Sequence, residues 1–490
     1  NWIPADALPS RISDAETRDL LQSAADAHMN MIRVWGGGRY EPASFYEACD
    51  ALGLLVWQDL MYACHLYPAT EAFLQAAEQE ARFQKRRIGH HVALWCGDNE
   101  LLGALNWFPE SRANRDRYLV AYDRLYRTLE TSVAGDGTNW WPSSPSPGPM
   151  SFGDAWHDDS AGDMHFWSVW HEGRDFEHYR DVRPRFCSEF GFQSYTSLPV
   201  IRSFAGEADL NIASPVMESH QKNAGGNARI AETMFRYFRF PKDFPSFVWL
   251  SQVQQGVAIK TAVDYWRSLK PHCMGALYWQ LNDTWPVASW SSLDYGGGWK
   301  LMHYMAKRFF QPVHVAALPA GETLRFVAVN DTERAQQVEV ELFAVSLDGA
   351  DTRPLATGGA VVGTDAALLL TEIETAHVAA GEILAYRWKA ANGMAGGDVF
   401  SPLRWKHLDL RPANIRVATE VRGDRLVARL AAESVAFFVT LEADRPGRFS
   451  NNAIALFPGH EAEITFTPAA GDAAGTTLTV RDLHSSYTAA

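Results

Sequence analysis

The sequence predicts a multidomain protein in which a (β/α)8 (TIM) barrel is followed by two immunoglobulin-like β-sandwich domains. The 490 residues exceed one ordinary domain and suggest roughly two to four. Over residues 1–310, short apolar runs alternate with amphipathic helical patterns, which is typical of a parallel sheet. After that point, short alternating segments separated by turn residues indicate β-sandwiches. The predicted domains are 1–310, 311–394 and 395–490.

Eight segments in the first region have the character of buried strands, because they are short, apolar and bounded by turn signals. They are Trp2-Ile3, His28 to Trp35, Leu54 to Asp59, Val92 to Gly97, Thr138 to Trp141, Asp163 to Trp167, Pro184 to Glu189 and Met274 to Leu281. Eight strand–helix units over roughly 300 residues fit a (β/α)8 barrel. A doubly wound sheet is the structural competitor, but no G-x-G-x-x-G follows any strand, so its dinucleotide-binding version lacks support.

The helices between the first strands carry clear start and stop signals. Ser13 and Glu16 form a capping-box pattern at the start of the first helix. Pro42 opens the second helix and Gly53 closes it. The third begins near Thr70 and ends in three basic residues, a charge order that complements the helix dipole.

The strands expected in the sandwiches are Leu324 to Val329, Val338 to Phe343, Ile383 to Trp388, Leu426 to Leu430, Val435 to Leu441 and Glu463 to Thr467. A glycine-rich run, Asn392 to Gly397, is expected to separate the two sandwiches. Aromatic residues make up 12% of the chain, with 18 Trp. Of these Trp residues, 16 precede residue 311, so they belong to the predicted barrel and its mouth.

Composition narrows the classes of function. The 44 Lys and Arg against 58 Asp and Glu give a net charge of −14, which argues against nucleic acid or an anionic membrane as a partner. The sequence contains no run of about 18 apolar residues, so no membrane span is expected. Its first residues show no signal-peptide pattern. Periplasmic, secreted and cytoplasmic locations stay open. The five cysteines form no C-x-x-C pair and are expected to be reduced, buried thiols rather than metal ligands.

A barrel carries its chemistry at the C-terminal ends of its strands. The fourth predicted strand leads into Glu100, and the seventh ends at Glu189. Two carboxyl groups facing one cavity suggest a glycosidase, in which one stays protonated as the acid and the other stays ionised as the nucleophile. A single Glu at a strand end more often forms a salt bridge with a neighbouring Arg. Two at matching positions favour catalysis.

Longer segments around these two residues carry a family resemblance. They are NWIPAD (1–6), MIRVWGGGRYE (31–41), WQDLMYAC (57–64), LWCGDNE (94–100), WPSSPS (141–146), DMHFWSVW (163–170), SEFGFQS (188–194) and LYWQLNDTWP (277–286), with weaker matches at VNDT (329–332) and FSNNAIALFPG (449–459). On these segments the chain resembles the catalytic and C-terminal part of a β-mannosidase of glycoside hydrolase family 2.

The resemblance implies an exo-acting retaining hydrolase of terminal, non-reducing β-D-mannose residues that needs no cofactor and no metal. In this family an Asn precedes the acid/base Glu, and the nucleophile Glu ends the seventh strand. The resemblance therefore assigns Glu100 as acid/base, Glu189 as nucleophile and Asn99 as a donor to the sugar 2-OH. A retaining reaction predicts about 5–5.5 Å between the two carboxyl groups.

Other site residues follow from their places at strand ends and in the matching segments. Arg33 is expected to hold Glu189 ionised, and Asp59 is expected to support the site. His165 suits a bond to a sugar hydroxyl, although a core histidine fits equally well. Stacking against the C–H faces of a pyranose is predicted for Trp35, Trp107, Trp167 and Trp279.

The chain departs from the family pattern at two points. Asp98 stands where the family often has Asn, and its charge would raise the pKa of Glu100 if the two were near enough. Family members also carry a sugar-binding-like domain and an immunoglobulin-like domain before the barrel, whereas this chain opens on the first barrel strand. We therefore expect an N-terminal fragment, or N-terminal domains of the same enzyme, as a partner that supplies part of the pocket.

Two alternatives to a β-mannosidase stay open. One is another family 2 exo-glycosidase, such as a β-glucosaminidase or a β-galactosidase. The other is a sugar-binding protein without activity, against which the presence of both Glu100 and Glu189 counts.

Overall fold

The computed structural model describes residues 1–135, 137–148 and 158–488. The chain divides into two compact units. The first comprises residues 1–192, 272–285 and 295–297, and the second comprises 193–271, 286–294 and 298–490. Among the described residues, no helix is both long enough and apolar enough to cross a membrane.

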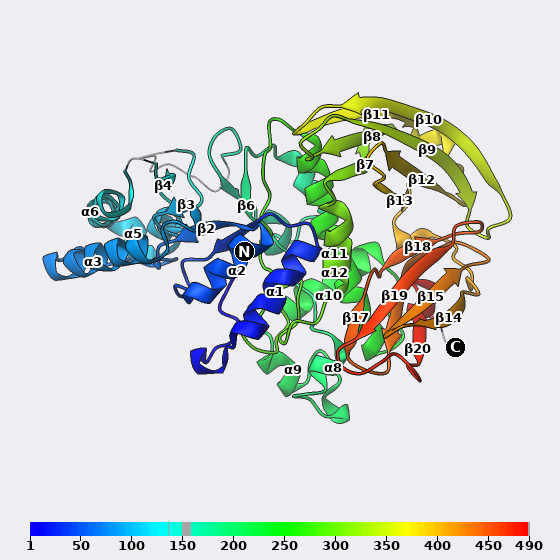
Figure 1. Ribbon diagram of the computed structural model, residues 1–490, viewed down its shortest axis with the longest axis horizontal. Coiled ribbons are helices and arrows are strands. Elements are labelled where there is room, and N and C mark those ends of the chain that lie inside the picture. Colours follow the sequence, from blue (N-terminus) through cyan, green and yellow to red (C-terminus); the bar gives the residue numbers. More distant parts are fainter. Residues whose placement is uncertain (136, 149–157, 489–490) are drawn as a thin grey trace. The chain divides into compact units, whose positions relative to one another are not determined.

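The first unit is a parallel α/β structure (Figure 1). Its strands are β1 (Met31–Val34), β2 (Leu55–Asp59), β3 (Val92–Cys96), β4 (Trp140–Trp141), β5 (Met164–His165) and β6 (Cys187–Glu189). Its helices are α1 (Asp14–Asp26), α2 (Ala43–Leu52), α3 (Glu71–Ile88), α4 (Leu101–Trp107), α5 (Pro109–Ala113), α6 (Arg115–Val133) and α7 (Ser168–His171), with 3-10 turns at Pro9–Arg11 and Phe176–Asp181.

The strands of this unit form two parallel ladders. β1, β2, β3 and β4 pair in chain order, and Trp2 adds a parallel bridge to Val34 at the open edge of β1. β5 pairs with β6, and Cys187 in β6 forms a parallel bridge with Ala276. Parallel pairing places the carboxyl ends of these strands at one edge, which is where polar side chains follow the apolar runs.

Hydrogen bonds among the described residues do not close these strands into a continuous barrel. β4 and β5 are connected through an antiparallel bridge between Ser146 and Asp163. The strand expected over Met274 to Leu281 is reduced to the bridge at Ala276. One physical reason is that the carbonyls of Leu277 and Tyr278 accept hydrogen bonds from the Asn1 side chain instead of from a neighbouring strand.

The helix signals read from the sequence are confirmed. The Ser13 hydroxyl accepts from the Glu16 amide, and the Glu16 carboxylate accepts from the Ser13 amide, which satisfies two otherwise unpaired donors at the start of α1. Gly53 ends α2 in the left-handed region, with φ of 71°, where glycine carries no side-chain penalty. Thr70 caps α3 by accepting from the Phe73 amide.

The second unit combines helices with antiparallel sheets. Its helices are α8 (Leu198–Ile201), α9 (Pro215–Ser219), α10 (Gly226–Tyr237), α11 (Phe244–Ser268) and α12 (Leu301–Phe309), with 3-10 turns at Glu207–Asp209, Thr375–His377, Trp405–His407 and His484–Ser486. Its strands are β7 (Val313–Ala320), β8 (Thr323–Asn330), β9 (Gln336–Ser346), β10 (Thr352–Val362), β11 (Ala366–Glu374), β12 (Glu382–Ala390), β13 (Ala395–Phe400), β14 (Arg416–Arg422), β15 (Arg425–Ala431), β16 (Ala436–Ala443), β17 (Gly447–Phe449), β18 (Ile454–Leu456), β19 (Ala462–Pro468) and β20 (Leu478–Arg481).

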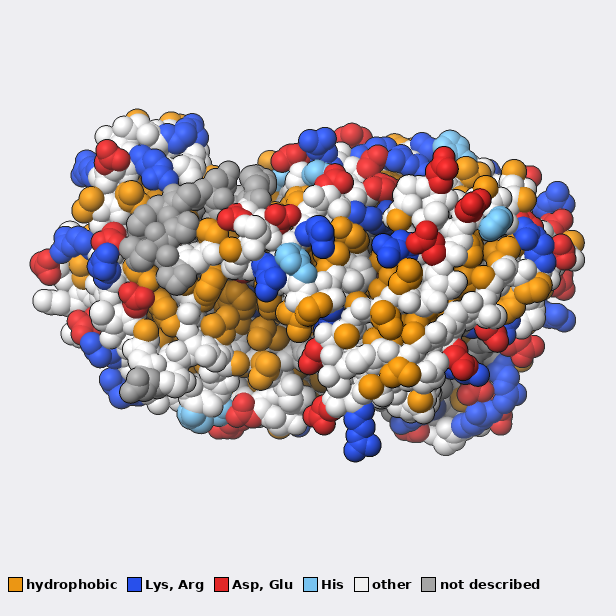
Figure 2. Space-filling model, turned by 90° about the horizontal axis from the view of Figure 1, so that it is seen from above, with side chains coloured by type: hydrophobic (Ala, Val, Ile, Leu, Met, Phe, Trp, Pro, Cys, Tyr) orange, Lys and Arg blue, Asp and Glu red, His pale blue; other side chains and the backbone are white. Residues whose placement is uncertain are grey.

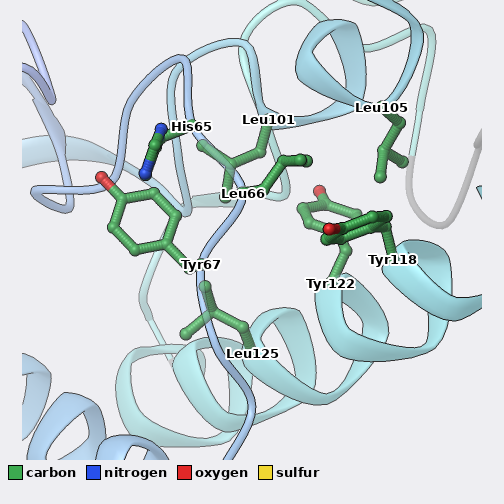
Figure 3. Close-up of a pocket in the computed structure, with 8 residues that line it drawn as sticks. All are labelled: His65, Leu66, Tyr67, Leu101, Leu105, Tyr118, Tyr122 and Leu125. Atoms are coloured by element: carbon green, nitrogen blue, oxygen red, sulfur yellow. The ribbon is translucent and has the colours of Figure 1, made fainter. Parts of the chain in front are cut away.

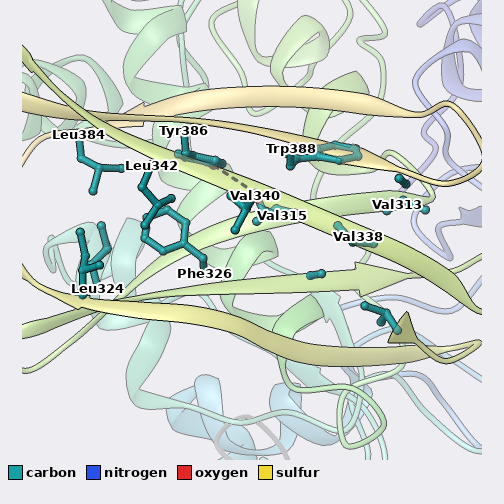
Figure 4. Packing of buried hydrophobic residues seen from close by; sticks show 14 of the residues in the cluster. Val313, Val315, Leu324, Phe326, Val338, Val340, Leu342, Leu384, Tyr386 and Trp388 are labelled. Atoms are coloured by element: carbon teal, nitrogen blue, oxygen red, sulfur yellow. Dashed lines mark hydrogen bonds between the residues drawn. The ribbon is translucent and has the colours of Figure 1, made fainter. Parts of the chain in front are cut away.

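These strands form two pairs of sheets, as expected for β-sandwiches. The first pair has the orders β10-β9-β12-β13 and β11-β8-β7, and the second has β14-β15-β19-β17 and β18-β16-β20. Alternation along β9 buries Val338, Val340 and Leu342 and exposes Glu339 and Glu341, because successive side chains of a strand point to opposite faces. Figure 4 shows these inward side chains packed in the core of the first pair.

The glycine-rich run forms a hairpin where the sequence predicts a separation between sandwiches. Gly396 and Gly397 lie in β13, which pairs with β12 in antiparallel register. A Cβ on Gly396 would lie 2.8 Å from the Trp388 indole nitrogen, so glycine allows this strand to pass close to a large ring.

Charged side chains of both signs are interspersed over the face shown in Figure 2. The net charge of −14 is therefore not gathered into one acidic patch on that face.

Candidate active site

The two predicted carboxyl groups lie together in the first unit. Glu189 is the last residue of β6, and Glu100 directly precedes α4. One oxygen of each carboxyl group and one ring nitrogen of His165 all lie within 4.8 Å of one another. The structure therefore brings together the two carboxyl groups that the sequence analysis singles out.

Glu100 has an unusual backbone. Its φ of 62° lies in the left-handed region, which a residue with a side chain rarely adopts. Its amide donates to the Ser144 carbonyl at 2.8 Å, and its carbonyl accepts from the Ala104 amide. Cys64, whose thiol faces the Glu100 carboxyl group, also has a positive φ, 52°. Strain of this kind is frequent where a site demands a particular side-chain direction.

Arg33 is the cation at the centre of the site. It is fully buried, and its guanidinium donates to Glu189 Oε1 at 2.6 Å, to Asn99 Oδ1 at 2.6 Å and to Asn1 Oδ1 at 2.8 Å. Asp59 accepts from the same group through both oxygens, at 3.3 and 2.8 Å. Burial lowers the pKa of Arg33, but the negative charges of Asp59 and Glu189 raise it by more. The net pKa is raised, so the guanidinium stays positively charged.

The environment of Glu189 favours its ionised form more than that of Glu100 does. Burial raises the pKa of Glu189, and the adjacent Arg33 opposes that rise by charge and by hydrogen bonding. The Trp167 indole also donates to Glu189 Oε2 at 3.3 Å. A carboxylate held by a guanidinium and an indole N–H is a suitable nucleophile.

The side chains that contact the Glu100 carboxyl oxygens most closely are those of His165 and Cys64. His165 Nδ1 lies 2.7 Å from Glu100 Oε1, and the Cys64 thiol donates to Glu100 Oε2 at 3.2 Å. Burial, followed by the charge of Glu189, raises the pKa of Glu100 well above its ordinary value. A carboxyl group with a raised pKa holds its proton more tightly, which is suited to a general acid.

His165 touches both carboxyl groups rather than standing apart as a hydroxyl ligand. Its Nδ1 is 3.4 Å from Glu189 Oε2 in addition to the contact with Glu100. Its other nitrogen, Nε2, lies 3.0 Å from the Ser144 hydroxyl, which in turn donates to Asp163 Oδ2 at 2.7 Å. Burial and the charge of Arg33 lower the pKa of His165 well below its ordinary value, so the ring is neutral.

Asp98 does not act on Glu100 through its charge as the sequence suggests. Its carboxyl group accepts from the Leu101 amide at 3.2 Å, the Ser143 hydroxyl at 2.6 Å and the Tyr122 hydroxyl at 3.1 Å. Asp98 is not among the main causes of the raised Glu100 pKa. Burial raises the pKa of Asp98 itself to about 7.

Three of the four predicted tryptophans come close to one another or to the carboxyl groups. Trp35 and Trp279 pack edge to face, with ring centroids 4.9 Å apart, and Trp167 contacts Glu189. Trp107 ends α4, about 10 Å along the helix axis from Glu100, and 39% of its surface is exposed. Its role as a sugar contact stays a prediction.

A small pocket is lined by Leu101, the residue that follows Glu100 in the chain (Figure 3). It encloses about 260 Å³ of space, partly open to solvent, and α4, α6 and the segment after β2 supply its walls. Its lining residues are His65, Leu66, Tyr67, Leu101, Leu105, Tyr118, Tyr122 and Leu125. Tyr122 thus belongs both to this mainly apolar wall and to the hydrogen bonds around Asp98.

Glu100, His165 and Glu189 each offer a ligand atom, and these atoms lie close enough together to suggest a metal site. Two ligands on one tetrahedral zinc ion, however, lie about 3.3 Å apart. The 2.7 Å contact between His165 and Glu100 is shorter, as expected for a hydrogen bond, and Glu189 is already paired with Arg33. We therefore assign these three residues no role as metal ligands.

Sequence reasoning missed four polar residues of the site. Ser144, Asp163 and Asn1 carry no signal of their own in the sequence, and the sequence predicts only a buried thiol for Cys64. All four lie in segments that carry the family resemblance, so position within those segments was the one available signal.

Comparisons with known proteins support the resemblance. A β-mannosidase from Bos taurus is 32% identical to this chain in an alignment of 493 positions that covers 93% of this chain and 56% of that protein. β-Mannosidase B from Aspergillus niger is 31% identical, over 95% of this chain and 59% of its own length. The chain therefore spans just over half the length of these relatives. An Ig-fold domain model, Ig_mannosidase, matches residues 410–486.

Solved structures agree with this result. The crystal structure of a β-D-mannosidase from Dictyoglomus thermophilum has a TM-score of 0.88 and 30% identity, over 98% of this chain and 60% of that one. The exo-chitosanase CsxA from Amycolatopsis orientalis has a TM-score of 0.73 over 96% of this chain and 61% of that one, but at 15% identity it shows only a common fold. The predicted resemblance to β-mannosidases is confirmed.

Proposed function

We propose that this chain, which is homologous to β-mannosidases along almost its whole length, carries the acid and the nucleophile of a retaining exo-β-mannosidase. The observation that carries the proposal is the unequal environment of two neighbouring carboxyl groups. Burial raises the pKa of both groups, but Arg33 opposes the rise at Glu189, whereas the charge of Glu189 adds to the rise at Glu100. The substrate is a β-mannoside with a terminal, non-reducing β-D-mannose.

In the first step Glu189 attacks the anomeric carbon and forms a covalent mannosyl ester. The bond from that carbon to the leaving oxygen breaks, and Glu100 transfers its proton to this oxygen. The alcohol then leaves and Glu100 remains as a carboxylate. In the second step Glu100 removes a proton from water, the water oxygen bonds the anomeric carbon, and the ester bond to Glu189 breaks.

The distance between the acids supports retention of configuration. Oxygens of the two carboxyl groups lie within 4.8 Å, close to the ~5–5.5 Å typical of retaining glycosidases and below the ~6.5–9.5 Å of inverting ones. The larger spacing would be needed to seat a water molecule between a base and the sugar. A direct attack by Glu189 fits the observed arrangement better.

The amide of Asn99 is oriented for a sugar hydroxyl. Because Arg33 can only donate, Asn99 must present its oxygen to Arg33 and its NH2 group to the opposite side, where one hydrogen reaches Cys64 Sγ at 3.3 Å. We propose that this NH2 group donates to the 2-OH, and that Trp35, Trp167 and Trp279 bound the sugar. Asp59 orients Arg33.

We also propose that the parallel strands are those of a (β/α)8 barrel over 1–310, followed by two immunoglobulin-like domains. Because β13 pairs with β12 in the first pair of sheets, we propose the boundary between these two domains after Phe400 rather than at residue 394. Support comes from the parallel ladders of β1–β4 and β5–β6 and from the shared site at their carboxyl ends. Barrel enzymes place their active sites at that end.

Hydrolysis of nitrophenyl β-mannoside, compared with the gluco, galacto and glucosamine analogues, tests the proposal. We expect the mannoside to have the highest kcat/KM. A preference for the glucosaminide or the galactoside would indicate another exo-glycosidase. Binding of all sugars without release of nitrophenol would indicate a sugar-binding protein.

A further inference from the structure

A directional series of hydrogen bonds passes through the carboxyl group of Glu100. Its members are Arg33, Asn99, Cys64, Glu100, His165, Ser144 and Asp163. The two ends are unlike, because Arg33 can only donate and an ionised Asp163 can only accept. The direction of every bond between them can therefore be derived from the ends.

From the Arg33 end, the series delivers a hydrogen to Glu100 Oε2. Arg33 donates to Asn99 Oδ1, so Asn99 donates from Nδ2 to the Cys64 sulfur. The thiol hydrogen of Cys64 is then directed to Glu100 Oε2 at 3.2 Å. Burial raises the pKa of Cys64, so the thiol keeps this hydrogen. Glu100 Oε2 is thus an acceptor and not the oxygen that carries the acid proton.

From the Asp163 end, the series determines which nitrogen of His165 carries hydrogen. Asp163 Oδ1 accepts from the Trp141 indole at 2.7 Å and the Ser146 amide at 2.9 Å. Its Oδ2 accepts from the hydroxyls of Ser144 at 2.7 Å and Ser188 at 2.5 Å. Burial raises the pKa of Asp163, but these four donors oppose the rise and suit an ionised carboxylate.

The Ser144 hydroxyl has one hydrogen and two possible acceptors besides His165, namely Asp163 Oδ2 at 2.7 Å and the Ser188 hydroxyl at 3.3 Å. The shorter contact, to a charged acceptor, takes the hydrogen, so the Ser144 oxygen accepts from His165. The 3.0 Å contact with Nε2 therefore requires hydrogen on Nε2. A neutral ring with hydrogen on Nε2 has a lone pair on Nδ1. That lone pair lies 2.7 Å from Glu100 Oε1, so the hydrogen between them belongs to Glu100.

The charged alternative, an imidazolium facing a Glu100 carboxylate, is disfavoured. His165 is completely buried, and the positive charge of Arg33 further lowers its pKa. The acidic groups around the ring are Glu189, Asp59, Asp163 and Cys64. Arg33 pairs with Asp59 and with Glu189 Oε1, and the thiol of Cys64 is neutral. Glu189 Oε2 lies 3.4 Å from Nδ1, farther than Glu100 Oε1 at 2.7 Å, and accepts from the Trp167 indole, while the Ser144 hydroxyl lies between Asp163 and the ring.

We propose that Ser144 and Asp163 are positioning residues that hold His165 as its Nε2–H tautomer and so keep the proton of the acid pair on Glu100 before substrate binds. The catalytic meaning of this assignment rests on the proposed function, but the tautomer itself can be measured without turnover. After Glu100 has protonated the leaving group, its carboxylate faces a lone pair on Nδ1. That repulsion favours recovery of a proton from the attacking water.

Nitrogen NMR of the chain labelled with ¹⁵N-histidine tests the assignment directly. The His165 resonances are identified by their loss in His165→Gln. We expect one protonated nitrogen, Nε2, and an unprotonated Nδ1 at neutral pH. Hydrogen on Nδ1, or on both nitrogens, would overturn the proposal. Because this readout needs no substrate, it stands even if the proposed β-mannosidase activity is wrong.

Variants then test the role of Ser144. In Ser144→Ala, Nε2–H loses its acceptor, so we expect the ring to move hydrogen to Nδ1 and donate to an ionised Glu100. The alkaline limb of the kcat/KM profile should then shift to lower pH by about one unit or more, because a donor stabilises the charged acid. Ser144→Thr, which keeps a hydroxyl, should restore both the tautomer and the limb.

Ser188→Ala is the matched control. The Ser188 hydroxyl donates to Asp163 as that of Ser144 does, and it lies 3.3 Å from the Ser144 hydroxyl, but it forms no hydrogen bond with the His165 ring among the described contacts. It should keep the Nε2–H tautomer. An unchanged tautomer and an unchanged alkaline limb in Ser144→Ala would contradict the positioning role. If Ser144→Ala does not fold, Asp163→Asn is expected to give the same change of tautomer, and retention of Nε2–H there would contradict the role equally.

Discussion

Arg33 donates to Glu189 at 2.6 Å, and both side chains are buried. The same guanidinium also pairs with Asp59, so one buried cation serves two carboxylates. Glu100 lies outside this pairing and instead contacts the neutral ring of His165. Because an unpaired charge is costly in a buried site, the pKa of this third acid is raised well above its ordinary value by burial and by the charge of Glu189.

Replacement of Glu189 by Gln is expected to reduce kcat for nitrophenyl β-mannoside by at least about a thousandfold, or about 4 kcal/mol of transition-state stabilisation. The amide cannot form the ester intermediate. Steady-state hydrolysis measures the effect. The control is Glu78→Gln on α3, whose exposed carboxylate pairs with Arg82. Turnover of Glu189→Gln near that of the control would remove Glu189 from its role.

Glu100→Ala should affect substrates according to their leaving groups. A nitrophenol that departs without protonation can still form the mannosyl ester, whereas an alkyl mannoside cannot, so the loss in kcat/KM should be far larger for the alkyl substrate. Added azide should restore turnover of the activated substrate, because it attacks the ester without needing a base, and should yield β-mannosyl azide. Equal losses for both substrates would contradict the acid/base role.

Arg33→Met is expected to destabilise the protein by about 3–5 kcal/mol, because it leaves Asp59 and Glu189 buried without a cation. Urea unfolding followed by fluorescence measures the change. Arg82→Met breaks the exposed pair with Glu78 and should cost about 0–1 kcal/mol. If both variants lost a similar amount of unfolding free energy, the ion pairs of Arg33 would not stabilise the fold as expected.

Asp98→Asn should make the protein more stable at neutral pH. Burial raises the pKa of Asp98 from 3.8 to about 7, so the folded state binds this proton more tightly than the unfolded state. The free energy of unfolding of the parent protein therefore falls as pH rises from about 4 to about 7. The variant avoids a penalty on the order of 4 kcal/mol, and its advantage should grow across that window.

Asp348→Asn provides a control of opposite sign. Hydrogen bonds from the Ala350 amide and the Ser346 hydroxyl lower the pKa of Asp348, so its contribution to stability is present above its unfolded pKa and is lost on acidification. This variant should lose stability relative to the parent as pH rises. Urea unfolding at pH 4, 6 and 8 compares the variants, and a pH-independent difference for Asp98→Asn would contradict the buried-acid account.

The sequence could predict the two carboxyl groups because each follows an apolar run. Parallel strands bring their carboxyl ends together, so Glu100 and Glu189 were expected to meet without knowledge of exact register. Helix boundaries can also be predicted from the sequence, because the capping signals at Ser13 and Gly53 depend on local backbone hydrogen bonds and φ angles.

The remaining site residues depend on tertiary placement. Ser144 is one of several serines in its segment, and only the fold brings it between His165 and Asp163. Asp98 and Glu100 would share a face in an extended strand, but the positive φ of Glu100 ends the extended conformation, and Asp98 turns to Leu101, Ser143 and Tyr122. No sequence pattern predicts this left-handed backbone conformation at Glu100.

Trapping of the covalent intermediate tests the central claim most directly. A 2-deoxy-2-fluoro-β-mannosyl fluoride reacts as a substrate, but its fluorine slows hydrolysis of the ester, so the label accumulates on the nucleophile. We predict a single added 2-fluoromannosyl group, which peptide mass spectrometry places on Glu189. A label on Glu100 or another residue, or turnover with no labelled protein, would contradict the assignment of Glu189 as nucleophile and Glu100 as acid.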